Sequence, residues 1–181
     1  GATSAAEIEG NTIYAVDDGF TATASSTCID VSSAGVVVIK GNVIFGSGSS
    51  STAMSILLSS SSIVYVHNNF IYTDGASSVY AFRLINTPVK IRNNTIYLAG
   101  VSAGFSYGML LTGYSGSTTL NIDNNIIHGM DSADLTTYGI YASGFGFSGL
   151  SGFSLVRNNF DGLDFFTKDS TYEYSTIENV N

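Results

Sequence analysis

Aliphatic and polar residues recur in one fixed order along the chain. An isoleucine or valine is followed by an ionisable residue, then by Gly or Asn, and then by Asn. The aliphatic residues that open the copies are Ile8, Ile39, Val66, Ile91, Ile122 and Val156, and a weaker seventh copy covers residues 177–180. Successive copies are 31, 27, 25, 31, 34 and 21 residues apart. This variable spacing is typical of a solenoid whose coils carry loops of different length.

Each copy predicts two short strands joined by a bend. Side chains alternate between the two faces of a strand, so the opening aliphatic residue and an isoleucine two positions after the second Asn both point inward. Those isoleucines are Ile13, Ile44, Ile71, Ile96 and Ile127. Asn suits the bend because it tolerates the left-handed backbone conformation, and stacked Asn amides can hydrogen-bond from coil to coil. The predicted asparagine ladder consists of Asn11, Asn42, Asn69, Asn94, Asn125 and Asn159.

A third apolar segment lies between successive copies. Its aligned versions are residues 27–31, 52–56, 80–84, 107–111 and 138–142, in which the third and fifth positions are apolar. We expect those positions to point inward, each contributing about 1.5–3 kcal/mol by burial. Three strands per coil, joined by bends and without a sustained helical period, predict an all-β fold. The expected architecture is a parallel β-helix of about six coils. Residues 1–181 form a single domain, either alone or as a fragment of a longer solenoid.

The repeated Ile/Val-x-Asn-Asn-x-Ile pattern with variable loops resembles the right-handed parallel β-helix repeats of the pectin-lyase-like superfamily. The resemblance covers nearly the whole chain and implies the fold. It leaves the activity open, because that superfamily includes polysaccharide lyases, hydrolases and esterases, phage tailspikes and surface proteins without catalysis. The catalytic sets of its enzymes are incomplete here. Asp17 and Asp18 have no Gly-His-Gly or Arg-x-Lys motif to accompany them, the chain has no Gln, and Arg83 has Ser55 and Leu110 as its predicted neighbours.

The charge of the chain narrows the classes of partner. Six Lys and Arg stand against 14 Asp and Glu, a formal net charge of −8, so the chain cannot neutralise a long phosphate track and we expect no nucleic-acid partner. No apolar run approaches the about 20 residues of a membrane-spanning helix, so we expect no membrane insertion. Abundant Ser, Thr, Gly and Asn with few lysines favour an extracellular or cell-surface location. The single cysteine, Cys28, rules out an intrachain disulfide.

An aromatic column is expected on the outer surface, three residues after the bend Asn. Its members are Tyr14, Phe45, Tyr72, Tyr97 and His128. They alternate with the inward isoleucines, which places them outward. Three interpretations remain open: plain cross-strand stacking, contact with another protein, and contact with a carbohydrate. The ionisable position of each copy forms a second outward column, interpreted as a surface charge ladder or as a binding stripe for a charged polymer.

Acidic loop residues are the candidates for a metal site. Asp131, Asp134, Asp161 and Asp164 could lie on adjacent coils and together bind calcium, which prefers several oxygen ligands. The alternative is that they are solvated loop residues, and no other cofactor is expected. Asp161 falls in the column that holds isoleucine in the other coils. Either the strand ends early there, with Phe160 and Leu163 filling the core, or Asp161 is functional.

These features favour a non-catalytic β-helix with a structural, assembly or adhesive role. A β-helix without caps exposes strand edges at its ends, so we expect self-association through these ends, by head-to-tail stacking into filaments, or through the aromatic column. A polysaccharide is the other candidate partner. The competing hypothesis is a carbohydrate-active enzyme, a polysaccharide lyase or hydrolase, or a carbohydrate-binding β-helix.

Overall fold

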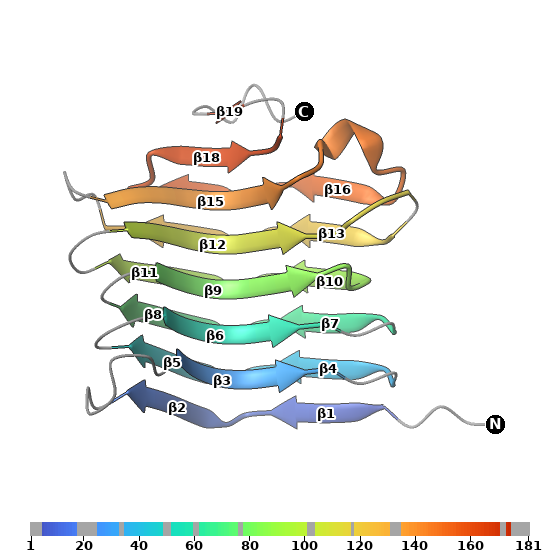
Figure 1. Cartoon of the computed structure of the whole chain (residues 1–181). Helices are drawn as coiled ribbons and strands as arrows, with labels where there is room; N and C mark the ends of the chain where they lie inside the picture. The colour runs from blue at the N-terminus through green and yellow to red at the C-terminus, as the bar shows by residue number, and fades with distance from the viewer. Residues whose placement is uncertain are drawn as a thin grey trace.

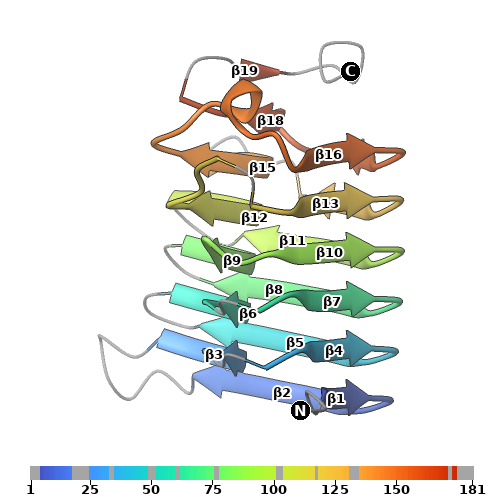
Figure 2. The ribbon, with the colours of Figure 1, turned by 90° about the vertical axis from the view of Figure 1, so that its right-hand side faces the viewer.

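Short parallel strands wind into a β-solenoid whose coils lie one above another (Figure 1). This computed structural model describes residues 5–17, 25–32, 35–48, 52–59, 62–75, 78–100, 104–116, 118–130, 135–170 and 173–174. Each coil contributes one strand to each of three parallel sheets, which confirms the fold predicted from the repeat. The same stacking is visible from the side, where the strands before the asparagine bends lie above one another (Figure 2).

The three sheets are named A, B and C in the order in which the chain enters them. Sheet A contains β1 (Ala6–Glu9), β4 (Val37–Lys40), β7 (Val64–His67), β10 (Val89–Arg92), β13 (Leu120–Asp123) and β16 (Phe153–Val156). Sheet B contains β2 (Thr12–Asp17), β5 (Val43–Gly48), β8 (Phe70–Gly75), β11 (Thr95–Gly100), β14 (Ile126–Gly129) and β17 (Asn159–Asp161). Sheet C contains β3 (Ser25–Val31), β6 (Thr52–Leu58), β9 (Ser78–Ile85), β12 (Gly104–Thr112), β15 (Leu135–Ser143), β18 (Phe165–Lys168) and β19 (Glu173–Tyr174). One 3₁₀ turn, η1 (Phe147–Gly149), follows β15.

The last strand departs from the parallel pattern. β19 runs antiparallel to β18, with Thr167 opposite Tyr174 and Lys168 opposite Glu173. It therefore covers the edge of β18 that an uncapped solenoid would expose. The seventh copy of the motif, at residues 177–180, lies outside the described residues.

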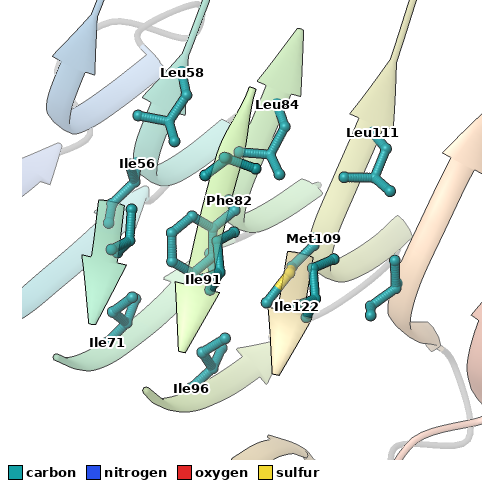
Figure 3. Close-up of a cluster of buried hydrophobic side chains, with 14 of the residues drawn as sticks. Ile56, Leu58, Ile71, Phe82, Leu84, Ile91, Ile96, Met109, Leu111 and Ile122 are labelled. Atoms are coloured by element: carbon teal, nitrogen blue, oxygen red, sulfur yellow. The ribbon is translucent and has the colours of Figure 1, made fainter. Parts of the chain in front are cut away.

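The core is a stack of aliphatic columns, as the repeat predicts. Ile39, Val66, Ile91 and Ile122 are direct neighbours in the register of sheet A and are all fully buried. Figure 3 shows how these columns meet in the interior, where Phe82 and Met109 from sheet C point toward isoleucines of the other sheets. At about 1.5–3 kcal/mol for each buried side chain, these columns supply the main stabilisation of the fold.

Two adjacent residues have different roles at each bend between sheets A and B. The first residue adopts the left-handed conformation, with φ between 54° and 67°, and the six examples are Gly10, Gly41, Asn68, Asn93, Asn124 and Arg157. The second residue forms the ladder. Asn94 illustrates it: its backbone N–H and its side-chain amide both donate to Oδ1 of Asn125, at 3.0 and 2.9 Å. The left-handed conformation and the ladder therefore belong to different residues.

The last step of the predicted ladder is wrong by one residue. Oδ1 of Asn158, and not that of Asn159, accepts the hydrogen bonds from Asn125. Leu155 pairs with Ile122, so Val156 is exposed and Asn159 lies on the outer surface. The physical reason is the identity of the side chain that each register would bury in the following strand, β17. This register places Phe160 in the core, whereas the predicted register would have buried the carboxylate of Asp161 at a cost of several kcal/mol.

The predicted alignment of the third strand is correct for four of the five segments and wrong for the segment 52–56. Met54, and not Thr52, lies opposite Tyr80, so Ile56 and Leu58 are the inward residues of β6. The neighbours of Arg83 in the sheet are consequently Leu57 and Leu110, in place of the expected Ser55 and Leu110.

Candidate functional site

The structure brings the predicted aromatic column together on the outer face of sheet B. Its five members are direct register neighbours in successive strands: Tyr14, Phe45, Tyr72, Tyr97 and His128. They are half-buried apart from Tyr14, which is 66% exposed at one end of the column. The outward placement follows from the isoleucine that precedes each of these residues, which points to the inner face of the same strand.

The rings in this column cover one another's faces. Tyr14 and Phe45 lie 4.9 Å apart with their planes 6° apart, and Tyr72 and Tyr97 lie 5.7 Å apart at 9°. His128 stacks on Tyr97 at 4.8 Å. The stack is interrupted only between Phe45 and Tyr72, which are tilted by 51°. The inner rings therefore leave mainly their edges open to solvent, an arrangement that stabilises the sheet through cross-strand stacking.

Asp161 continues the column beyond His128. It occupies the next register position in β17, and its Oδ2 lies 2.9 Å from His128 Nδ1. The expectation that Asp161 falls in the isoleucine column is wrong, since Phe160 fills that position. The register of this coil differs by one residue from the predicted one, and β17 also ends early, at Asp161, with Leu163 beyond it packed against the core.

A second aromatic column, which the sequence analysis missed, lies on the outer face of sheet C. Its register neighbours are Tyr80, Tyr107, Tyr138 and Phe165. Their centroids are 5.2, 5.4 and 5.2 Å apart and their planes differ by 7°, 11° and 16°. The three tyrosines were visible as the first residues of aligned segments. A strict two-residue alternation, however, places Tyr80 on the same face as the buried Phe82.

A local bend of the strands in sheet C explains the outward tyrosines. Ala81, Gly108 and Gly139 are skipped in the pairing between neighbouring strands, which reverses the alternation of faces at that point. These residues point inward and are confined. A Cβ on Gly108 would lie 2.5 Å from the carbonyl oxygen of Gly139 and 2.8 Å from Ile127 Cγ2.

Further rings widen the second column into a surface. We define the sheet C aromatic face by six residues: Tyr80, Phe105, Tyr107, Tyr138, Tyr141 and Phe165. Phe105 is 48% exposed, 6.1 Å from the Tyr107 ring. Tyr141 is tilted by 46° against both Tyr107 and Tyr138, so it does not lie parallel to the rings of the stack.

A lysine lies beside this face. Lys168 Nζ is 5.5 Å from the Tyr138 ring, 5.9 Å from the Tyr141 ring and 5.7 Å from the Phe165 ring, the geometry of a cation–π contact. Burial, and then the neighbouring tyrosines, raise the pKa of the Tyr107 phenol above its ordinary value. The face therefore combines flat apolar area with hydroxyl groups and one cation.

The structure does not bring the predicted calcium ligands together where it describes them. Asp161 contacts His128, and Oδ2 of Asp164 accepts hydrogen bonds from the backbone N–H and the hydroxyl of Thr137, at 2.7 and 2.9 Å. Asp131 and Asp134 lie outside the described residues. Within the described part of the chain, no group of three or more His, Cys, Asp or Glu side chains is placed to hold a metal ion.

The charged column of sheet A forms ion pairs at its two ends. Lys40 Nζ lies 2.5 Å from Glu7 and 3.2 Å from Glu9, and these contacts raise its pKa. The Arg157 guanidinium donates hydrogen bonds to both carboxylate oxygens of Asp123, the shortest at 2.7 Å. These contacts hold the pKa of the Asp123 carboxyl below its usual value. Arg157 reaches Asp123 from the bend, since Val156 occupies the predicted place in the column.

Comparison with known proteins agrees with this architecture. A family model described as a right-handed beta helix region matches residues 1–181. No curated protein and no solved structure matches the chain. Across the ranges that the structure describes, no helix has the length and apolar character needed to cross a membrane.

Proposed function

The chain belongs to the right-handed β-helix family, and we propose that it is a non-catalytic, extracellular or cell-surface protein with an adhesive role. The observation that carries this proposal is the sheet C aromatic face, where six rings and Lys168 gather on one outer surface. Phe105 is the exposed ring of this face, Tyr138 is buried within it and the other four rings are half-buried. A cluster of partly open aromatic rings on an outer surface is typical of contact surfaces.

The structural hydrogen bonds of two described carboxylates support the non-catalytic part of the proposal. A glycosidase needs two carboxyl groups that face one another across the bond to be cleaved. Here the carboxylate of Asp164 binds the backbone of Thr137, and that of Asp169 accepts a hydrogen bond from the backbone N–H of Phe147 at 2.9 Å. These carboxylates hold the fold together and leave no matched pair among themselves.

Tyrosine predominates in the sheet C aromatic face, and this supports adhesion over simple core packing. Tyr107 and Tyr141 combine an apolar ring with a hydroxyl, which lets a surface contact both apolar and polar groups of a partner. The tilt of Tyr141 leaves its ring out of the parallel stack. The partner in this proposal is therefore a surface with mixed character, either another protein or a polysaccharide, in keeping with an extracellular setting.

Carbohydrate binding or cleavage is the second candidate function. The observation in its favour is that the same outward column of sheet C contains Arg83, Tyr141 and Lys168. Cations beside tyrosine rings suit an acidic sugar chain. Leu57 and Leu110 lie on either side of Arg83, however, so no acidic neighbour in the sheet is available to tune its proton chemistry.

Adhesion is tested with paired surface variants. We expect Phe105→Ser combined with Tyr141→Ser to abolish attachment of the chain to intact cells and to immobilised extracellular material. Tyr14→Ser is the matched control, because Tyr14 is an exposed ring at the end of the sheet B column. Equal attachment by all three proteins would contradict the proposed contact surface.

The two candidate functions are separated by assays on polysaccharides. The adhesive proposal predicts no release of reducing sugar and no unsaturated product from a panel of neutral and acidic polysaccharides. Release that Arg83→Ala abolishes would establish the enzyme instead. Electron microscopy of the same samples tests self-association: fibres that disappear in the Phe105→Ser, Tyr141→Ser protein would place the contact between copies on the aromatic face.

A further inference from the structure

A cationic hollow lies on the outer face of sheet A, away from the sheet C aromatic face. It has a volume of about 330 Å³ and is lined by Tyr65, His67, Lys90, Arg92 and Asn93. Lys90 pairs with Tyr65 and Arg92 pairs with His67 in the register of β7 and β10. Adjacent strands lie about 4.8 Å apart and alternate residues of one strand about 6.6 Å apart, so three nitrogen-bearing side chains face one small volume.

The charges in this hollow are only partly balanced by neighbouring carboxylates. In the described part of the chain, Lys90 and Arg92 form no ion pair with a carboxylate. Carboxylates lie near the hollow on both neighbouring coils, but their ion pairs are with other cations. Glu7 and Glu9 bind Lys40, which is the neighbour of His67 in β4. Asp123, the neighbour of Arg92 in β13, binds Arg157 and has only a weaker electrostatic interaction with Arg92.

This local excess of positive charge is unusual for this chain. The molecule has a formal net charge of −8 and only six Lys and Arg residues, so two cations and a histidine in one hollow are a strong concentration. Placing like charges side by side costs electrostatic energy unless an anion relieves it. The position of Lys90 is also defined by a contact, since its Nζ lies 5.6 Å from the centre of the Tyr65 ring.

We propose that this hollow binds a tetrahedral oxyanion, as carried by a phosphate or sulfate group. One arginine fork satisfies a planar carboxylate, whereas a tetrahedral group has enough acceptor oxygens to use Arg92, Lys90 and His67 together. The tyrosine and Asn93 at the margin supply an apolar wall and an amide for the remainder of the ligand. The site is independent of the adhesive function, because it lies on a different sheet.

The test is calorimetric titration of the full chain with inorganic phosphate, with sulfate and with acetate, at one ionic strength. We expect saturable one-to-one binding of phosphate or sulfate and at least about tenfold weaker binding of acetate. Equal affinity for phosphate and sulfate would identify the tetrahedral oxyanion as the recognised group. Phosphate alone would identify phosphoryl groups, and sulfate alone would identify sulfate groups.

Two variants locate the site. Arg92→Gln should weaken phosphate or sulfate binding at least tenfold, and Arg83→Gln, which removes the same charge from the exposed surface of sheet C, should leave it unchanged. Backbone amide shifts of the unmodified protein provide a second measurement and should concentrate at residues 65–67 and 90–93. Equal binding of acetate, equal loss in both variants, or shifts spread over the whole surface would overturn the proposal.

Discussion

The side-chain oxygen of Asn158 accepts hydrogen bonds from both the backbone N–H and the side-chain amide of Asn125, at 2.9 Å each. The amide of Asn158 in turn donates to the carbonyl oxygens of Ile122 and Val156. One buried side chain thus satisfies polar groups from two coils at the bend. Because buried polar groups without partners are costly, the ladder stabilises both the bend and the stacking of the coils.

Replacing Asn158 by Val should lower the free energy of unfolding by about 1–3 kcal/mol. The substitution leaves the buried backbone N–H of Asn125 without its acceptor and removes one of the three acceptors of the Asn125 side-chain amide. Asn159→Val is the control, because Asn159 is exposed and its column contains Val43 and Ile126 in other coils. Urea denaturation of both variants checks this, and similar losses in the two proteins would contradict the assignment of the ladder.

Replacing Gly41 by Ala should destabilise the protein by about 1–2 kcal/mol through the backbone alone. Gly41 has φ of +63°, and the nearest atom to an added Cβ is 3.9 Å away, so no steric clash contributes. Gly41→Asn should cost less, because Asn68 and Asn93 adopt the same conformation at the equivalent bends. Thermal unfolding of the pair measures the difference, and a larger loss for Gly41→Asn would refute the conformational explanation.

Replacing Gly108 by Ala should destabilise the protein by about 1–3 kcal/mol or more, because the added Cβ would overlap the carbonyl oxygen of Gly139. This backbone atom cannot move without disturbing the neighbouring strand. Gly149→Ala is the matched control, since an added Cβ there meets no atom within 4 Å. The yield of folded protein and its melting temperature report the outcome. A harmless Gly108→Ala would show that β12 and β15 lie further apart than described.

The ion pair between Asp123 and Arg157 should make stability depend on pH in the acid range. The pKa of Asp123 is lower in the folded chain than in the unfolded chain, so its contribution is present above the ordinary Asp pKa near 3.9 and is lost as the pH falls through the lowered value. Asp123→Asn should therefore be less stable than the unmodified protein at pH 7 and equal to it near pH 2. A difference that persists unchanged at pH 2 would contradict this origin.

The sequence alone determined the winding of the chain and most of its core. Local rules are sufficient for this, because the two-residue alternation around each bend fixes which side chains point inward. The columns of Ile39, Val66 and Ile91 and the stacked rings of Tyr72 and Tyr97 follow directly from it.

The tertiary structure decided the features that depend on competition or on contacts between coils. Both Leu155 and Val156 fit the repeat locally, and the choice between them depends on whether Phe160 or Asp161 is buried beside the next sheet. Tyr107 points outward because the pairing of the strands is irregular at Gly108. Only glycine fits at that position, since an added Cβ would lie 2.8 Å from Ile127 Cγ2.

The cationic hollow depended on the fold in the same way. Tyr65 and Lys90 are 25 residues apart in the sequence, and only their register in sheet A brings them together. How much of the Arg92 charge is left without a counter-charge depends on Asp123 forming its hydrogen bonds with Arg157, a choice of partner that no local pattern encodes. Periodicity specifies which way a side chain points, whereas packing and pairing energies between coils specify what it meets.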